Sequence, residues 1–320
     1  MPAETLSEQL VKYLTDVHAM EVQALAQMRA APKLAGDPEL ARAFEAHCDE
    51  TAVHERLTRE RLEAHDAKPS KLEDMLGALS GKGFVLFARS QPDTPGKLAA
   101  HAFSYEHMEL AAYDLLQRVA ERAGDAETVA VARRIRAEED AMAATLGGSW
   151  DGSVAASLEG KDAAEALDSY LADAHALEAQ AIQLLERGPK IAGESQLATL
   201  MEAHLAESRR HQELVDARLE ARGGSSSKLK DTALRMGAIN WGGFFGAQKD
   251  TPAKLAMFAY AFEHLEIGGY EQLARVARRA GDEESAGVAG RILPEERAAA
   301  EKLFAAFPAA LDASLEAVLT

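Results

Sequence analysis

The chain has 320 residues, 47% of them hydrophobic, which is enough for two domains that each bury a core. Its formal net charge of −17 argues against binding to nucleic-acid phosphates and suits a protein that attracts cations. The only cysteine, Cys48, excludes an intrachain disulfide and a cysteine-rich zinc site. Because no apolar run approaches the roughly 20 residues of a membrane span, and no signal pattern opens the chain, we expect a cytoplasmic protein without membrane or nucleic-acid partners.

Alanine and leucine abound and only 6% of the residues are aromatic, so the composition predicts an all-α protein. Apolar residues recur at helical spacing through the first half of the chain. Asp37–Pro38 supplies a helix start, and Gly124–Asp125 ends one helix and caps the next. The predicted helices of this half cover residues 5–30, 38–66, 96–123 and 125–146.

The segment between the second and third helices, residues 67–95, is irregular and holds several glycines and prolines. It predicts a long crossover with a short helix. Aromatic residues of the two crossovers, such as Phe84 and Trp241, are expected to cover the bundle ends. Two short loops and one long connection between the second and third helices are typical of a ferritin-like four-helix bundle.

The second half of the chain repeats the first at a constant offset of 157 residues, since Glu106 returns as Glu263 (263 − 106 = 157). This repeat predicts two tandem ferritin-like bundles that form a pseudo-dimer within the chain, with a homo-oligomer as a further option. The stretch from residue 147 to residue 152 indicates a flexible break. The expected domains are residues 1–150 and 164–320, joined by a linker with a short helix at residues 151–163.

Carboxylates stand on the core-facing stripe of the third helix. Glu106, Glu109 and Tyr113 lie at positions i, i+3 and i+7, so they face the same way among apolar neighbours. Burying an ionised carboxylate costs several kcal/mol unless a cation, a metal or a proton compensates its charge. The third helix therefore predicts either shared protons or bound metal. Tyr105 or Tyr113 could be a redox-active or hydrogen-bonding neighbour of such a site, but we favour a packing role for both.

Each half offers glutamates from all four helices and at least one histidine from the second helix, which is the donor set of a dinuclear carboxylate site. Either His47 or His54 could serve the metal of Glu50, and we favour His54. The predicted metal ligands of the first half are Glu21, Glu50, His54, Glu106, Glu109 and Glu138. Those of the second half are Glu178, Glu207, His211, Glu263, Glu266 and Glu295.

These motifs resemble the YciE/YciF-like stress-protein family, a domain of unknown function placed among ferritin-like proteins. The resemblance rests on Glu-His-x-Glu-(Leu/Ile)-x-x-Tyr beginning at Glu106, on residues 14–25 and 44–51, and on the Glu138–Glu139 pair. It covers nearly all of both halves. The resemblance implies a ferritin-like bundle, di-iron binding and a stress-linked role.

The sequence departs from better-known di-iron proteins in two ways. Those proteins resemble one another in a Glu-x-x-His motif on the second and fourth helices, whereas Ala141 and Ala298 occupy the histidine position of the fourth helices here. Fewer nitrogen ligands imply weaker metal retention. In the second half, Pro294 directly precedes Glu295 and is expected to kink the fourth helix, so we predict that the first half does the chemistry.

Two functions follow as hypotheses. The first is a metal-dependent oxidoreductase or iron-handling protein, in which iron, or alternatively manganese, reacts with peroxide or dioxygen. The second is a non-catalytic helical scaffold or protein-interaction module, in which the carboxylates share protons or pair with histidines. The metal content of protein purified without chelators separates the two.

Overall fold

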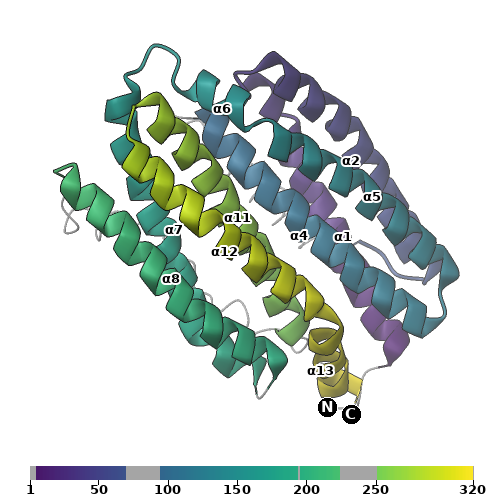
Figure 1. The fold of residues 1–320 in the computed structure, drawn as a ribbon. Coiled ribbons are helices and arrows are strands. Elements are labelled where there is room, and N and C mark those ends of the chain that lie inside the picture. Colours follow the sequence, from purple (N-terminus) through teal and green to yellow (C-terminus); the bar gives the residue numbers. More distant parts are fainter. Residues whose placement is uncertain (1–4, 70–93, 194, 224–250, 320) are drawn as a thin grey trace. The chain divides into compact units, whose positions relative to one another are not determined.

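The computed structural model describes residues 5–69, 94–193, 195–223 and 251–319. Within these ranges every regular element is helical, as the composition predicts (Figure 1). The chain divides into two compact units, residues 1–157 and 158–318. The sequence repeat therefore corresponds to two structural units. The crossover helices and the aromatic covers predicted around Phe84 and Trp241 lie outside the described residues.

The first unit holds four long helices whose ends agree with the predicted ends to within two residues. Gly124 ends one of them in the left-handed region, at φ 73°, and the Asp125 side chain then accepts from the Thr128 amide to cap the next. The helices are α1 (Leu6–Met28), α2 (Pro38–Ala64), α4 (Thr94–Ala123) and α5 (Ala126–Gly148), with the short helix α6 (Trp150–Ser157) and the 3-10 turn η1 (Ala31–Lys33).

The four long helices form a closed bundle in which α1 packs against α2 and α4, and α5 packs against α4 and α2. Near the end of α2, Arg61 bonds to Asp125, which follows the end of α4. Helices α2 and α4 therefore end at the same end of the bundle and run parallel. Their connection must return along the 27 residues of α2, about 40 Å at 1.5 Å per residue. A single crossover at this point is the connectivity of ferritin-like bundles.

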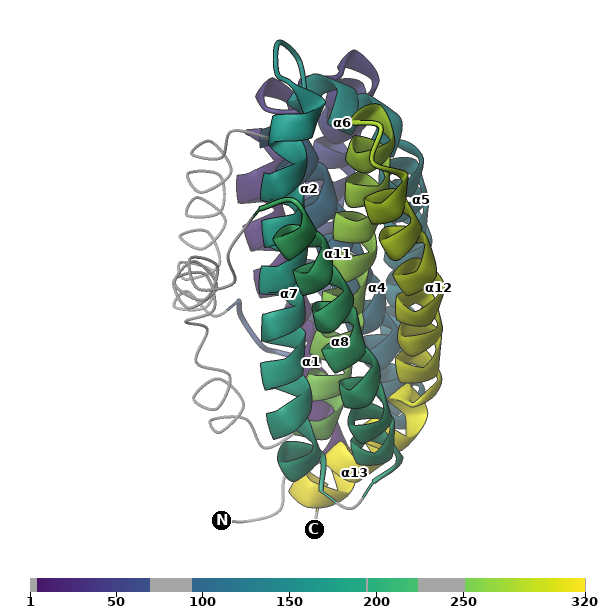
Figure 2. The ribbon, with the colours of Figure 1, turned by 60° about the vertical axis from the view of Figure 1, so that its left-hand side comes forward.

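The second unit repeats this order (Figures 1 and 2). Arg218 bonds to Asp282 at the counterpart of the Arg61–Asp125 pair, which gives α8 and α11 the same parallel relation. The helices are α7 (Ala163–Ala192), α8 (Gln196–Ala221), α11 (Thr251–Arg279), α12 (Glu283–Ala305) and α13 (Phe307–Leu319).

The predicted flexible break at residues 147–152 is wrong. Helix α5 runs to Gly148, and α6 starts two residues later at Trp150. The Trp150 side chain is only 3% exposed and packs edge-on against Phe103 of α4, with ring centroids 5.2 Å apart. At the other end of α6, the Ser157 hydroxyl accepts from the Gly96 amide at 2.8 Å. Helix α6 is therefore fixed to the start of α4, and no hinge separates it from α5.

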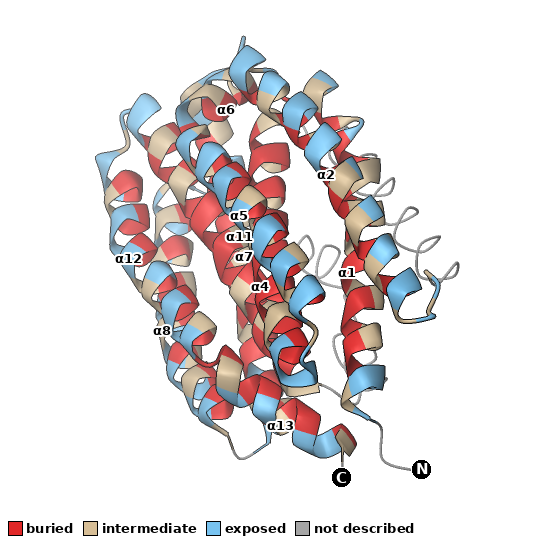
Figure 3. Cartoon of the chain, turned by 90° about the vertical axis from the view of Figure 1, so that its right-hand side faces the viewer, coloured by how far each residue is buried: buried red, intermediate tan, exposed pale blue. Residues whose placement is uncertain are grey.

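Helix α12 continues through Pro294 without a break, and the kink expected there stays a prediction. On α2, α5 and α8 the buried residues follow one stripe, and exposed residues lie on the opposite side of the helix (Figure 3). No helix in the described ranges is long and apolar enough to cross a membrane. Each unit thus encloses a core between four helices, and the ionisable groups on those inner stripes need an explanation.

Candidate metal centre

Three glutamates from two helices enter the core of the first unit. Glu21 comes from α1, and Glu106 and Glu109 come from α4, one helical turn apart. Their exposed fractions are 0%, 0% and 1%. The prediction that the carboxylates of α4 are buried is confirmed. Helix α1, which carries Glu21, packs against α4.

Two histidines of α2 enter the same region, because His47 and His54 are seven residues apart and share one face of the helix. Their ring centroids are 6.3 Å apart. His47 turns Nε2 toward Glu106 Oε2, at 3.3 Å, and His54 turns Nδ1 toward Glu21 Oε2, at 3.8 Å. Both histidines therefore belong to the cluster, where the sequence left a choice between them.

Glu139 of α5 joins the two histidines. Its Oε1 lies 2.8 Å from His54 Nδ1, and its Oε2 lies 3.2 Å from His47 Nε2. Neither oxygen makes a hydrogen bond of normal geometry, although Glu139 is 1% exposed. The cluster thus divides into two groups that share this carboxylate: Glu21, His54 and Glu139 form one, and His47, Glu106 and Glu139 form the other.

The atoms that face the centre of the cluster are orphaned. Glu21 Oε2, both oxygens of Glu106, Glu109 Oε1 and the inner nitrogens of the two histidines have no hydrogen-bond partner. Ligand atoms about 2.1 Å from an octahedrally coordinated ion lie about 3.0 Å from their neighbours. The nitrogen–oxygen distances of 2.8 to 3.3 Å between the histidines and Glu139 and between His47 and Glu106 match that spacing. These atoms form no hydrogen bond with one another. The residues present therefore fit a metal ion in each group.

The outer nitrogens of the histidines bond to two carboxylates at the rim. Glu50 Oε2 lies 3.0 Å from His47 Nδ1, and Glu138 Oε2 lies 2.6 Å from His54 Nε2. Their side chains are 50% and 29% exposed. A carboxylate that accepts the outer N–H of a metal-binding histidine fixes its tautomer and orients its ring. Of the predicted ligands, Glu50 and Glu138 thus lie behind the histidines and not at the centre.

Tyr113 is more than a packing residue, because its hydroxyl donates to Glu21 Oε1 inside the core. Tyr105 donates to the Met20 carbonyl at 3.0 Å. The hydrogen bond from Tyr113 leaves the second oxygen of Glu21 directed toward His54. Tyr113 of α4 therefore orients the carboxylate of Glu21, which comes from α1.

The second unit reproduces this geometry. His204 Nε2 lies 3.0 Å from Glu263 and 3.3 Å from Glu296, and His211 Nδ1 lies 2.7 Å from Glu296 and 3.6 Å from Glu178. These distances differ from those of the first unit by at most 0.3 Å, the largest difference being 3.0 against 3.3 Å at Glu263 and Glu106. His211 faces Glu178 Oε1, the oxygen that also accepts from Tyr270, whereas His54 faces Glu21 Oε2. Glu266 lies in the core of this cluster, and the Tyr270 hydroxyl donates to Glu178. Glu207 and Glu295 bond to the outer nitrogens of the two histidines. Pro294 thus leaves the second cluster in the same arrangement as the first.

Burial and crowding shift the ionisation of these groups. Burial, reinforced by the charge of Glu139, raises the pKa of Glu21 to about 8. Burial also raises the pKa of Glu106 to about 8, although His47 opposes the shift, and it raises the pKa of Glu109 well above its usual range. The second unit shows the same directions, with the pKa of Glu178 and of Glu263 near 7.

The histidines and the shared glutamate shift in the opposite sense to the other glutamates. Burial would lower the pKa of His47, but Glu106 and Glu139 raise it to about 12. His54 is likewise raised, to about 9, mainly by Glu139 and Glu21 against the effect of burial. Burial would raise the pKa of Glu139, but His47 and His54 hold it well below its usual range. Without a cation, each cluster must therefore take up protons to compensate its carboxylates.

The sequence analysis missed one glutamate per half, since it named Glu138 and Glu295 where the core holds Glu139 and Glu296. The signal was present: Ile135, Glu139 and Met142 lie at i, i+4 and i+7, and all three are buried. It also expected fewer nitrogen ligands than the structure offers. Both imidazoles of each cluster come from one helix, α2 or α8, instead of one each from the second and fourth helices.

Comparison with known families agrees with the internal repeat. The model of a domain of unknown function, DUF892, matches residues 5–159 and again residues 162–316. No solved structure matches the chain. The two matches include both clusters and cover almost the whole sequence. The chain therefore belongs to the DUF892 family and carries two tandem copies of its domain.

Proposed function

We propose that each unit binds two divalent metal ions, with iron as the physiological metal and manganese as the alternative. Glu139 carries the proposal, because its two oxygens face inner nitrogens of two different histidines without hydrogen-bonding to either. Four buried carboxylates and two neutral imidazoles carry a charge of −4, which two divalent ions balance. A bridging carboxylate also offsets the repulsion between the ions. The four-helix bundle with one crossover is consistent with the ferritin-like resemblance.

Each residue has a distinct part in this site. His47 and Glu106 would hold one ion and His54 and Glu21 the other, and Glu139, which belongs to both groups, would contribute to each. Glu109 is the second candidate bridge, because burial and the charges of Glu139, Glu21 and Glu106 act on its carboxyl group and raise its pKa. Glu296 has the corresponding bridging place in the second unit.

The proposed activity is oxidation of Fe(II) by peroxide or dioxygen, in keeping with the stress-linked role that the YciE/YciF resemblance implies. When bound, two ferrous ions would supply the two electrons that reduce one peroxide to two waters. The chain's own part is to hold the ligands in a core that excludes bulk water and to deliver protons. The Tyr113 hydroxyl, already on Glu21, can hold a proton at the edge of the site. Metal binding itself displaces the protons that burial keeps on Glu21 and Glu106.

The test is an anaerobic titration of the full chain with Fe(II), followed by addition of peroxide or dioxygen. We expect four ions per chain, two in each unit, and oxidation in pairs. Glu139→Ala should reduce the count to two, and the double variant with Glu296→Ala should reduce it to zero. The exposed Glu45 of α2 offers a matched control, so Glu45→Gln should leave the count at four.

The scaffold hypothesis gives the opposite outcome. If the carboxylates only share protons and pair with histidines, the chain takes up no stoichiometric iron or manganese, and Glu139→Ala and Glu45→Gln behave alike. Binding without oxidation would support a metal-retaining role and reject the oxidoreductase. Two ions per chain in place of four, with Glu296→Ala silent, would restrict the function to the first unit.

A further inference from the structure

The second unit contains a cavity beside its metal cluster. Its volume is about 150 Å³, and it lies between α8, α11 and α12, with Leu185 of α7 completing the wall. Most of its lining is apolar, and its polar lining includes His204 and Glu263. Both residues belong to the cluster, and His204 Nε2 and Glu263 Oε2 have no hydrogen-bond partner. The cavity therefore reaches the metal site from one side.

Two residues that line the cavity are smaller than their counterparts in the first half. Met201 and Ala299 line the cavity, and the counterparts 157 residues earlier are the larger Phe44 and Met142. Phe44 is 0% exposed and Met142 is 5% exposed, so both lie within the core of the first unit. The ligand distances of the two clusters agree to within 0.3 Å, whereas the side chains at these two positions beside the ligands are larger in the first unit.

Gly188 helps to keep the cavity open. A Cβ atom at this position would lie 2.0 Å from Met201 Cε and 2.6 Å from its sulfur, so the Met201 side chain occupies the space that a Cβ would take. The first half has Ala31 at the equivalent position. An alanine at 188 would displace the flexible end of Met201, which lines the cavity.

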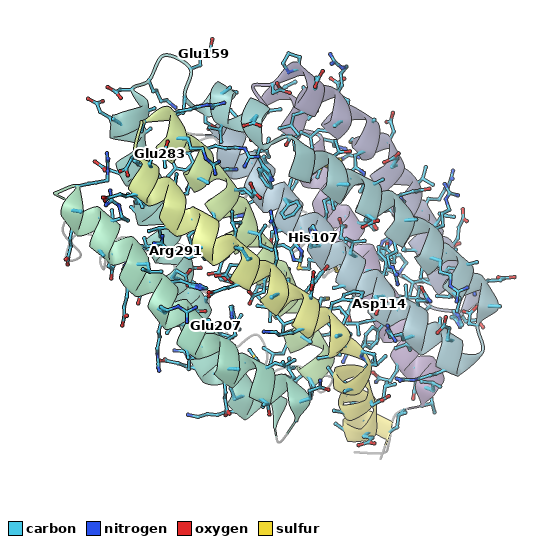
Figure 4. All side chains as sticks on the ribbon, in the orientation of Figure 1. His107, Asp114, Glu159, Glu207, Glu283 and Arg291 are labelled. Carbon is cyan, nitrogen blue, oxygen red and sulfur yellow. The ribbon has the colours of Figure 1, made fainter. Side chains whose placement is uncertain are left out.

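We propose that the second unit binds a small, mostly apolar molecule with one oxygen-bearing head group, and that this molecule reaches the metal site there. A cavity of about 150 Å³ can hold a benzene-sized molecule. The apolar walls select the body of the molecule. In the metal-free chain the unpaired polar atoms of His204 and Glu263 can bond an oxygen at its inner end, and in the metal-loaded chain, where the proposed function assigns these atoms to an ion, that oxygen would face the ion. Glu207 and the exposed Lys302 also line the cavity and identify its open side (Glu207 is labelled in Figure 4). Binding rests on the cavity alone, whereas a role as substrate rests on the proposed metal function.

The experiment is methyl NMR of the full chain labelled at its methionines, titrated with phenol, and with benzene as the probe without a head group. Spectra are recorded with and without zinc(II), which is diamagnetic and accepts the same ligand types as iron. The Met201 methyl resonance should shift saturably, and phenol should bind more tightly than benzene. The Met142 methyl group, at the counterpart of Ala299, is the internal control and should not shift.

A set of variants places the residue found in one half at the equivalent position of the other half. Ala299→Met and Gly188→Ala should each weaken phenol binding, the first by at least tenfold, while the zinc content stays unchanged. Met142→Ala in the first unit should create a second site, reported by the methyl group of Met28, the counterpart of Leu185. This gain of binding can be measured even if Ala299→Met and Gly188→Ala, the variants that add volume near the cavity, fold poorly.

An unresponsive Met201 signal, or equal shifts at Met201 and Met142 in the unmodified chain, would overturn the proposal. Unchanged binding in Ala299→Met would do the same. The metal hypothesis fails separately: if zinc(II) does not bind but phenol still shifts Met201, the cavity proposal stands and the metal function does not.

Discussion

At the scale of single residues, the account depends on the difference between two adjacent glutamates on α5. Glu139 lies in the core between two histidines, while Glu138 lies behind His54 and is 29% exposed. The pKa of each is lowered, although burial would raise it. His47 and His54 lower that of Glu139 against the effect of burial, and for Glu138 the His54 and Arg134 hydrogen bonds do so. The first residue is a proposed ligand, and the second orients one.

This division predicts how the two kinds of residue respond to substitution. Glu138→Gln keeps the volume and an acceptor for His54 but removes the charge, so the metal affinity should fall about 10- to 100-fold without loss of the site. Glu139→Ala should abolish binding in that unit. Competition titration against a chelator of known affinity measures both. Equal effects of the two substitutions would contradict the assignment, and Glu45→Gln should have no effect.

The site could be predicted in part because helical periodicity fixes faces well. Glu21, Glu106 and Glu109 lie on stripes of otherwise apolar residues, and the structure buries all three. Neighbouring positions differ by about 100° around a helix, so the choice between Glu138 and Glu139 needed the exact face of α5. The partner of His47 at the rim, Glu50, is three residues away on the same helix, but the partner of His54, Glu138, comes from another helix 84 residues later, which sequence spacing does not show.

At the scale of helices, the short helix α6 has a structural role that composition concealed. The glycines before Trp150 suggested a break, yet the buried tryptophan and the hydroxyl of Ser157 fix α6 to α4. Gly96 is the third residue of α4, so its N–H is one of the four that a helix start leaves without an internal partner. The Ser157 side chain supplies a partner from outside the helix.

Removing that partner should cost stability. Ser157→Ala is expected to lower the free energy of unfolding by about 1 kcal/mol, because a buried amide loses its hydroxyl acceptor. Ser314→Ala, which removes the acceptor of the Ala253 amide, should do the same in the second unit. Urea denaturation provides the comparison, with the exposed Ser7 changed to alanine as control. A loss no larger than that of the control would show that the contact is incidental.

The helices themselves were predictable because their signals are local. Caps such as Asp125 and glycines such as Gly124 mark ends, and apolar spacing marks faces. Pro294 lies inside α12, which continues past it, and the ligand distances of the second cluster stay within 0.3 Å of those of the first. A proline in a helix therefore does not by itself mark the end of the helix.

In the whole molecule, duplication has produced two units with similar clusters, and different side chains stand beside those clusters at Phe44 and Met201 and at Met142 and Ala299. Sequence comparison at the offset of 157 residues exposes the differing pair Phe44 and Met201, but their meaning depends on which neighbours surround them. The cavity thus could not be read from spacing alone. The internal repeat fits a pseudo-dimer, and a two-fold relation between the units stays a prediction.

The whole molecule should also respond to pH differently with and without metal. In the metal-free protein the pKa of Glu21 and of Glu106 lies near 8, above the unfolded value of about 4.3, so their contribution to stability is present at low pH and is lost as the pH rises through about 8. His54, raised to about 9, acts in the same direction. Glu139 opposes them only at acid pH, because its folded pKa is lowered and its contribution is lost as the pH falls through that low value.

We therefore expect the Tm of chelator-treated protein to rise as the pH is lowered from 9 to 5. The metal-loaded protein should have the higher Tm at pH 8, by mass action, and the difference should shrink toward pH 5 as protons compete for the ligands. Calorimetry at several pH values, with metal and with chelator, measures both trends. Identical curves under the two conditions would remove the support for a bound cation.

The most direct measurement is anomalous X-ray scattering from crystals of the full chain grown with Mn(II) or Fe(II). The account predicts two anomalous peaks in each unit, one on either side of Glu139 in the first unit and of Glu296 in the second. In the first unit, one peak should be ligated by His47 Nε2 and the other by His54 Nδ1. No peak at these positions, or a single peak bound by Glu50 or Glu138 at the rim, would contradict the assignment of a bridged two-metal site.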